Sequence, residues 1–124
     1  MSNLYFGFAL ADSMFDGDVT ITRSSITPEI AGEMIAIANI RGDLNVCLNP
    51  SHVATIDAMT KRFNIFVDIP ENPPQVKLNE GDSLIVMGVR GLKRLTDRHE
   101  YTNEEIELAT FTFSLYTIQH CNMQ

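Results

Sequence analysis

The chain has 124 residues, of which 44% are hydrophobic and 20% charged, and its formal net charge is −7. This size and composition predict one globular domain spanning residues 1–124. The acidic balance argues against general binding to DNA or RNA, because release of phosphate counterions requires a basic face. It is compatible with a small anionic ligand, which needs only a few local cations.

The N-terminus has no positively charged segment ahead of an apolar stretch, and no apolar run is long enough to span a bilayer. We therefore expect a cytoplasmic protein with no membrane association. The cysteines, Cys47 and Cys121, predict no disulfide framework. No cysteine and histidine spacing is typical of zinc, so we expect neither a metal nor another cofactor.

The first part of the chain predicts two strands and a helix. Residues 4–11 are typical of a buried strand, and residues 19–22 of a short alternating one. Thr27-Pro28-Glu29 then begins a helix, because it offers an N-cap hydroxyl, a proline at the first helical position and an acid in the first turn. The helix should end near Asn39 and bury one apolar stripe, formed by Ile30, Met34 and Ile37.

The middle of the chain predicts a central strand at 44–48 and a second helix that begins at Asn49-Pro50-Ser51. The inward-facing residues of that helix should be Val53, Ile56, Met59 and Phe63. Residues 65–69 alternate as a strand, and two further strands at 75–78 and 83–89 flank a hairpin-type turn at 79–82.

The last part of the chain predicts a short third helix and a final strand. Thr102-Asn103-Glu104-Glu105 is a capping box, and residues 110–117 are rich in Phe and Thr. The expected fold is therefore α+β: a mixed β-sheet with two longer helices and one short helix packed on it.

Residues 90–101 form a connection without periodic pattern that holds four of the nine basic residues. Arginine offers a planar fork of donors that matches phosphate. The candidate ligand-binding residues here are Arg90, Arg94, Arg98, His99 and Tyr101. The alternative is a solvated loop whose arginines pair with Asp97, Glu100 and the acids of the third helix.

The second candidate segment is the strand-to-helix junction at Asn49. Free backbone N–H groups at a helix start bind anions, and Thr55 adds a hydroxyl. His52 is suited to donate to a ligand oxygen or to act as a general acid or base. The alternative is simple capping, with His52 packed on the edge of the sheet. The glycine-rich phosphate loops are absent from the sequence.

Several segments resemble a family of small viral proteins that includes a ring nuclease degrading cyclic tetra-adenylate. These are residues 4–14, the Asn49-Pro50-Ser51-His52-x-x-Thr55 run and residues 81–87. Residues 69–74 and 89–102 further resemble one branch, Thoeris anti-defence protein one. The resemblance covers roughly residues 3 to 118, with scattered identities.

The branch implies a phage protein that sequesters cyclic nucleotide immune signals without cleaving them, as a homo-oligomer. Its ligands would be cyclic ADP-ribose isomers or the cyclic oligonucleotides of CBASS defence. His52 falls where the ring nuclease has its catalytic histidine, and Thr55 near its ligand-binding helix start. Arg94 and Asp97 fall near that enzyme's arginine and glutamate. Asp97 has a shorter side chain than the glutamate of the ring nuclease, and the loop that carries it is about two residues longer. Both differences argue against cleavage, because general acid catalysis depends on the placement of the proton donor.

The sequence therefore predicts a non-enzymatic cyclic-nucleotide-binding protein, active as a dimer or larger homo-oligomer. Its pocket would combine the 90–101 loop, the start of the second helix and the end of the first strand, with Tyr101, Phe6 or Phe8 stacking on a base. One alternative is a metal-independent ring nuclease that uses His52. The other is a protein-binding inhibitor whose acidic surface mimics nucleic acid.

Overall fold

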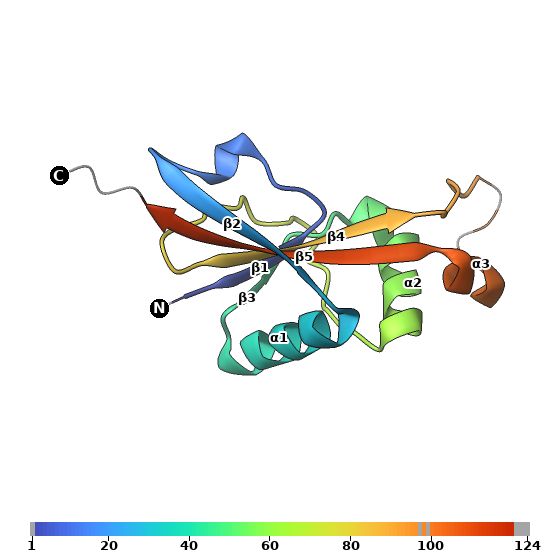
Figure 1. Ribbon diagram of the computed structural model, residues 1–124. Coiled ribbons are helices and arrows are strands. Elements are labelled where there is room, and N and C mark those ends of the chain that lie inside the picture. Colours follow the sequence, from blue (N-terminus) through green and yellow to red (C-terminus); the bar gives the residue numbers. More distant parts are fainter. Residues whose placement is uncertain (1, 97, 99, 121–124) are drawn as a thin grey trace.

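The computed structural model describes residues 2–96, 98 and 100–120, so Asp97 and His99 lie outside the described residues. A five-stranded mixed sheet has the strand order β2-β5-β4-β1-β3 (Figure 1). Two longer helices and one short helix accompany it, which confirms the predicted α+β fold. The elements are β1 (Leu4–Gly7), β2 (Val19–Ile26), α1 (Pro28–Arg41), β3 (Leu44–Val46), α2 (Val53–Phe63), β4 (Ser83–Arg90), α3 (Asn103–Leu108) and β5 (Thr110–His120), with short 3-10 helices η1 (Asp12–Met14) and η2 (Pro50–His52).

The pairing of the strands fixes two rows of residues across the sheet. β1 pairs in parallel with β3 and β4, whereas β5 runs antiparallel to both β4 and β2. Leu4, Ser83 and Thr117 form one row, so β1 begins and β5 ends at the same end of the sheet (Figure 1). A second row joins Gly7, Val86, Ser114 and Ser25.

One face of the sheet packs against α1 and α2. Alternate residues of each strand point into this main core, where Phe6 and Ile85 are completely buried. The helices contribute Ile35 and Met59. Phe63 lies edge-on to Phe111 and Phe113, with 5.2 and 5.7 Å between ring centroids. This burial of large apolar side chains is the main stabilising term of the fold.

Helix α1 starts as predicted but buries a different face. The Thr27 hydroxyl accepts the N–H of Ile30 at 3.1 Å, and the helix ends at Gly42, whose φ of 79° favours glycine. The buried residues are Ala31, Ile35 and Ala38. The predicted stripe is wrong in two of its three members, because Ile30 and Ile37 are exposed.

The other face of the sheet is covered over part of its area by two loop segments, residues 8–18 and 74–78. Val76, Leu78, Leu84 and Ile118 form a second, smaller core there. The N–H of Leu78 donates to the carbonyl of Met14 at 2.8 Å, so the two covering segments are joined to each other.

Two predicted strands, 65–69 and 75–78, are wrong because neither segment pairs with the sheet. Both nevertheless alternate between buried and exposed residues, since each lies over one of the cores. The alternation reports burial on one side and carries no information about backbone pairing. The turn at 79–82 therefore connects a loop to β4 and closes no hairpin.

Several element boundaries also differ from the prediction. β1 ends at Gly7 and β3 at Val46, both earlier than expected, whereas β2 extends to Ile26 and β5 to His120. Val53 is exposed, because the chain first makes the 3-10 turn η2 and α2 starts one turn later.

Hydrogen bonds of two side chains, Asp82 and Arg62, hold together elements that are distant in the sequence. The buried Asp82 carboxylate accepts the N–H groups of Asn3 and Asn79, both at 2.9 Å, which ties the start of β1 to the turn before β4. Nη1 of Arg62 donates to the carbonyls of Ile106 and Glu107 at 2.6 and 2.7 Å. Arg62 thereby fastens the carboxyl end of α3 to α2. No helix in the described part has both the length and the apolar composition to cross a membrane.

Candidate functional site

A hollow of about 340 Å³ lies where β1 and β3 end and η2 begins. β3 and β4 are successive strands of this part of the sheet and lie on opposite sides of β1, so the connection between them crosses β1. Ligands of open α/β sheets usually bind at the carboxyl ends of strands beside such a change of direction. The hollow is lined by residues of the sheet, the junctions and the 74–76 segment, among them Gly7, Phe8, Cys47, Asn49, His52 and Leu84.

Three residues predicted for the ligand site, Phe8, Asn49 and His52, meet in this hollow. The side-chain oxygen of Asn49 accepts a hydrogen bond from the N–H of Ser51 at 2.9 Å, and the backbone carbonyl of Asn49 accepts one from the N–H of His52 at 3.0 Å. These contacts stabilise η2, which leads directly into α2. The His52 ring lies edge-on to Phe8, with 5.1 Å between centroids. No hydrogen bond to another described residue engages the imidazole, which leaves both ring nitrogens for a ligand.

Thr55, the fourth residue predicted from this junction, lies in the first turn of α2. It is half-buried and does not belong to the lining of the hollow. The helix start itself is exposed at His52 and Val53. The structure therefore brings together the histidine, the amide and the aromatic ring, and places the hydroxyl of Thr55 further along the helix.

The predicted loop extends from the end of β4 towards α3, beyond the hollow (Figure 1). None of its described residues lines the hollow. Tyr101 closes the loop on itself, because its hydroxyl donates to the carbonyl of Lys93 at 2.7 Å. Arg90 ends β4 and Arg94 follows in the loop, both exposed. The binding role predicted for His99 falls on a residue outside the described part of the chain.

Arg98 has a carboxylate partner in α3. Its Nη1 and Nη2 donate to the two carboxylate oxygens of Glu105 at 2.6 and 2.5 Å. Glu105 also accepts the N–H of Thr102 in the capping box. The pKa of Glu105 is lowered to about 2, chiefly by the Arg98 hydrogen bonds. This is the pairing with the third helix that the sequence left open as an alternative, and a phosphate on Arg98 would compete with it.

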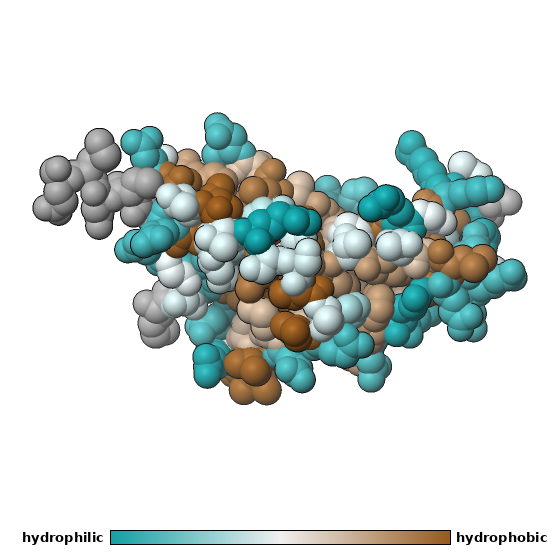
Figure 2. All heavy atoms as spheres, viewed as in Figure 1, coloured by the Kyte–Doolittle hydropathy of each residue, from teal (hydrophilic) through white to brown (hydrophobic). Residues whose placement is uncertain are grey.

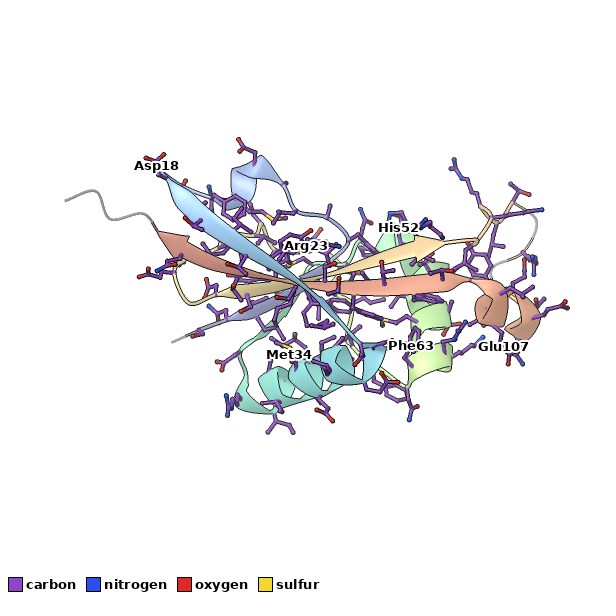
Figure 3. The ribbon with its side chains drawn as sticks, in the orientation of Figure 1. Asp18, Arg23, Met34, His52, Phe63 and Glu107 are labelled. Carbon is purple, nitrogen blue, oxygen red and sulfur yellow. The ribbon has the colours of Figure 1, made fainter. Side chains whose placement is uncertain are left out.

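Sequence reasoning missed Arg23 of β2, which it left just outside a strand ending at Thr22. Nη2 of Arg23 donates to the Ser114 hydroxyl of β5 at 3.0 Å. Figure 3 shows Arg23 on the same side of the sheet as His52. The only signal in the sequence was the polar run that continues the strand beyond residue 22, and its partner is 91 residues away.

The remaining chemistry of the site is limited. Burial raises the pKa of the Cys47 thiol to about 11, so this cysteine is protonated and unreactive at neutral pH. The described residues contain no group of three or more His, Cys, Asp or Glu side chains able to hold a metal ion. A larger hollow of about 680 Å³ lies between residues 10–18 and β2, but Asp12 and Asp18 line it and disfavour an anionic ligand.

Comparison with known proteins yields a likeness of fold. No family model matches the chain, and no curated protein matches it. Among solved structures, it is similar to B116 of Sulfolobus turreted icosahedral virus, with a TM-score of 0.72. The superposition covers 94% of this chain and 99% of B116 at 19% sequence identity. The chain therefore has the fold of a small archaeal viral protein.

Proposed function

We propose that this protein binds cyclic nucleotide immune signals and sequesters them without cleavage, as a viral anti-defence protein. The observation that carries the proposal is the hollow in which Phe8, Asn49 and His52 meet. The sequence resemblance to Thoeris anti-defence protein one supports the class of ligand, which comprises cyclic ADP-ribose isomers and cyclic oligonucleotides.

The residues of the hollow suit the parts of a nucleotide. An aromatic ring such as that of Phe8 offers a stacking face to a base, and such contacts contribute about 1–3 kcal/mol per base. Asn49 and His52 offer hydrogen-bonding groups beside that ring. The exposed Arg90 and Arg94 add positive charge at and after the end of β4, outside the lining of the hollow.

The same lining argues for binding over catalysis. Of the described residues that line the hollow, only His52 and Cys47 carry acid–base side chains, and the raised pKa of Cys47 keeps its thiol protonated. A metal-independent nuclease with His52 as general acid or base would need a second group within hydrogen-bond reach of the scissile phosphate. Among the described residues, none that lines the hollow supplies a carboxylate or a lysine for that role.

Self-association is part of this proposal, on grounds that differ from the expected ones. The sequence resemblance implies a homo-oligomer, and Phe6 and Phe113 of the first and last strands cannot form its interface because they lie in the core of one chain. The exposed apolar residues include three isoleucines of α1, and Phe66, which follows α2. Ile40 is 85% exposed and Phe66 70%, and Figure 2 shows apolar side chains on the underside, over α1. Burial of such a patch favours a homo-oligomer.

The proposal is tested by adding cyclic ADP-ribose or cyclic tetra-adenylate to the purified protein and measuring binding by calorimetry. The protein is then denatured by heat, and the released compound is identified by mass spectrometry. We expect binding and recovery of the intact ring. Accumulation of linear products beyond one equivalent per protein would establish the nuclease instead, and absence of binding would favour a protein-binding inhibitor.

The Phe8→Ala variant links that binding to the hollow. We expect it to bind about 5- to 150-fold more weakly, the equivalent of one lost stacking contact. The control is Leu108→Ala, which removes an exposed apolar side chain of α3 outside the lining of the hollow. Equal affinities of the two variants would place the ligand elsewhere.

A further inference from the structure

The sheet has an open polar area beside the hollow, on the face of the second core. Strand alternation puts Val86, Gly88 and Arg90 of β4 on this face, because Leu84 and Val86 contribute to the second core. Ser114 of β5 pairs with Val86, and Thr112 pairs with Gly88. In Figure 2, pale side chains of intermediate hydropathy lie across the middle of the face in view.

Small residues line the surface of the sheet in this area. A Cβ atom at Gly88 would lie only 2.6 Å from the Thr112 hydroxyl, which instead lies over the glycine and donates to its carbonyl at 3.5 Å. Gly7 and Ser114 continue this surface on either side of Val86. Along the row of Gly7, Val86 and Ser114, a flat ligand would meet no side chain larger than valine.

Arg23 is held at the far side of this area. Its Nη2 donates to Ser114 at 3.0 Å, and the serine is buried. Within the described part of the chain no carboxylate lies within ion-pair distance of Arg23, in contrast to Arg98 and its partner Glu105. A guanidinium has five N–H donors, and the contact of Arg23 with Ser114 uses one of them. The remaining N–H groups of this exposed side chain face solvent.

The register gives the distance between Arg23 and the hollow. Gly7, which lines the hollow, and Ser114, which holds Arg23, share one row of the sheet with only Val86 between them. Two strand spacings are about 10 Å. This span suits a ligand whose base occupies the hollow and whose phosphate reaches across β4 and β5.

We propose that Arg23, positioned by Ser114, is a phosphate-binding residue of the ligand site. This inference rests on the proposed function and deepens it, since it assigns the phosphate end of the nucleotide. The ligand then lies across β1, β4 and β5, with its base beside Phe8 and its phosphate on the planar fork of Arg23. Arginine suits this role because its fork meets two phosphate oxygens at once.

The test compares Arg23→Ala with Arg41→Ala, a control that removes an equal charge from the exposed end of α1. Affinities are measured by calorimetry for cyclic tetra-adenylate, cyclic ADP-ribose and adenosine, which lacks phosphate. We expect Arg23→Ala to weaken binding of the phosphorylated ligands about 10- to 100-fold and to leave adenosine binding unchanged. Arg41→Ala should bind all three like the parent.

Arg23→Lys adds a readout that a merely structural role would not move. It keeps the charge and loses the fork, so its affinity for the phosphorylated ligands should fall between those of the parent and of Arg23→Ala. If the parent binds these ligands and both Arg23 variants, folded by circular dichroism, bind equally well, the assignment is overturned while the proposed function stands. If the parent binds none of them, the proposed function fails, and this inference with it.

Discussion

The imidazole of His52 meets the ring of Phe8 edge-on, with 67° between their planes. The contact holds the histidine by packing alone, so its nitrogens are not already engaged within the described part of the chain. We expect His52→Ala to weaken cyclic-nucleotide binding about 2- to 10-fold, the effect of one neutral hydrogen bond. The bound ring should stay intact in both proteins, as chromatography at timed intervals will show. Turnover in the parent that vanishes in the variant would identify His52 as catalytic.

Arg62 provides a prediction on stability. Its removal leaves the carbonyls of Ile106 and Glu107 without their charged donor at the negative end of α3. We expect Arg62→Ala to lower the free energy of unfolding by about 1–2 kcal/mol, measured by urea denaturation. The neighbouring Lys61→Ala removes only the solvent-exposed pair with Asp57 and should change it by no more than about 0.5 kcal/mol. Equal effects would mean that Arg62 does not hold α3.

The Arg98–Glu105 pair predicts a pH dependence. The pKa of Glu105 is lowered from 4.5 to about 2 in the folded protein, so the folded state binds fewer protons than the unfolded state between these values. The stabilisation is therefore complete above pH 4.5 and is lost as the pH falls to about 2. Thermal melts of the parent and Glu105→Gln should differ above pH 4.5 and converge near pH 2. A difference that persists at pH 2 would contradict this assignment.

The exposed face of α1 predicts how the oligomer is broken. We expect the parent to elute above the monomer mass of 13.9 kDa in light scattering at micromolar concentration. Ile40→Glu should shift it towards that mass, because a charge cannot be buried without a partner. The control Leu108→Glu alters another exposed apolar residue, on α3, and should leave the mass unchanged. A parent that is already monomeric would overturn the proposed self-association.

Local signals predicted the helices well. Thr27 and Thr102 act as N-caps, and Asn49 caps η2, because capping depends on residues three or fewer positions apart. The same local reading could not choose the buried face of α1. That helix carries isoleucines on several sides, so its periodicity does not single out one stripe.

The strands show where local reasoning fails. Residues 65–69 alternate like a strand but pair with nothing, whereas β2 extends to Ile26 through a polar stretch because β5 supplies its hydrogen bonds. Pairing is a property of two distant segments, which no local pattern encodes.

The residues of the candidate site likewise divide into those that local sequence predicts and those that depend on distant segments. Phe8, Asn49 and His52 were predicted because a strand end and a helix start mark a junction in the sequence itself. Arg23 could not be predicted in this way, since its position on the sheet depends on the register between β2 and β5. The loop arginines were recognised by composition, which does not reveal that Glu105 already engages Arg98.

The row that joins Leu4, Ser83 and Thr117 has a practical consequence. The first and last strands enter and leave at one end of the sheet, whereas the hollow lies where β1 and β3 finish. A purification tag or a surface-attachment handle can therefore be added at either terminus without crowding the hollow. Immobilised by either end, the protein would keep the hollow open to a flowing sample, and the proposed binding of nucleotide signals could be measured on a surface.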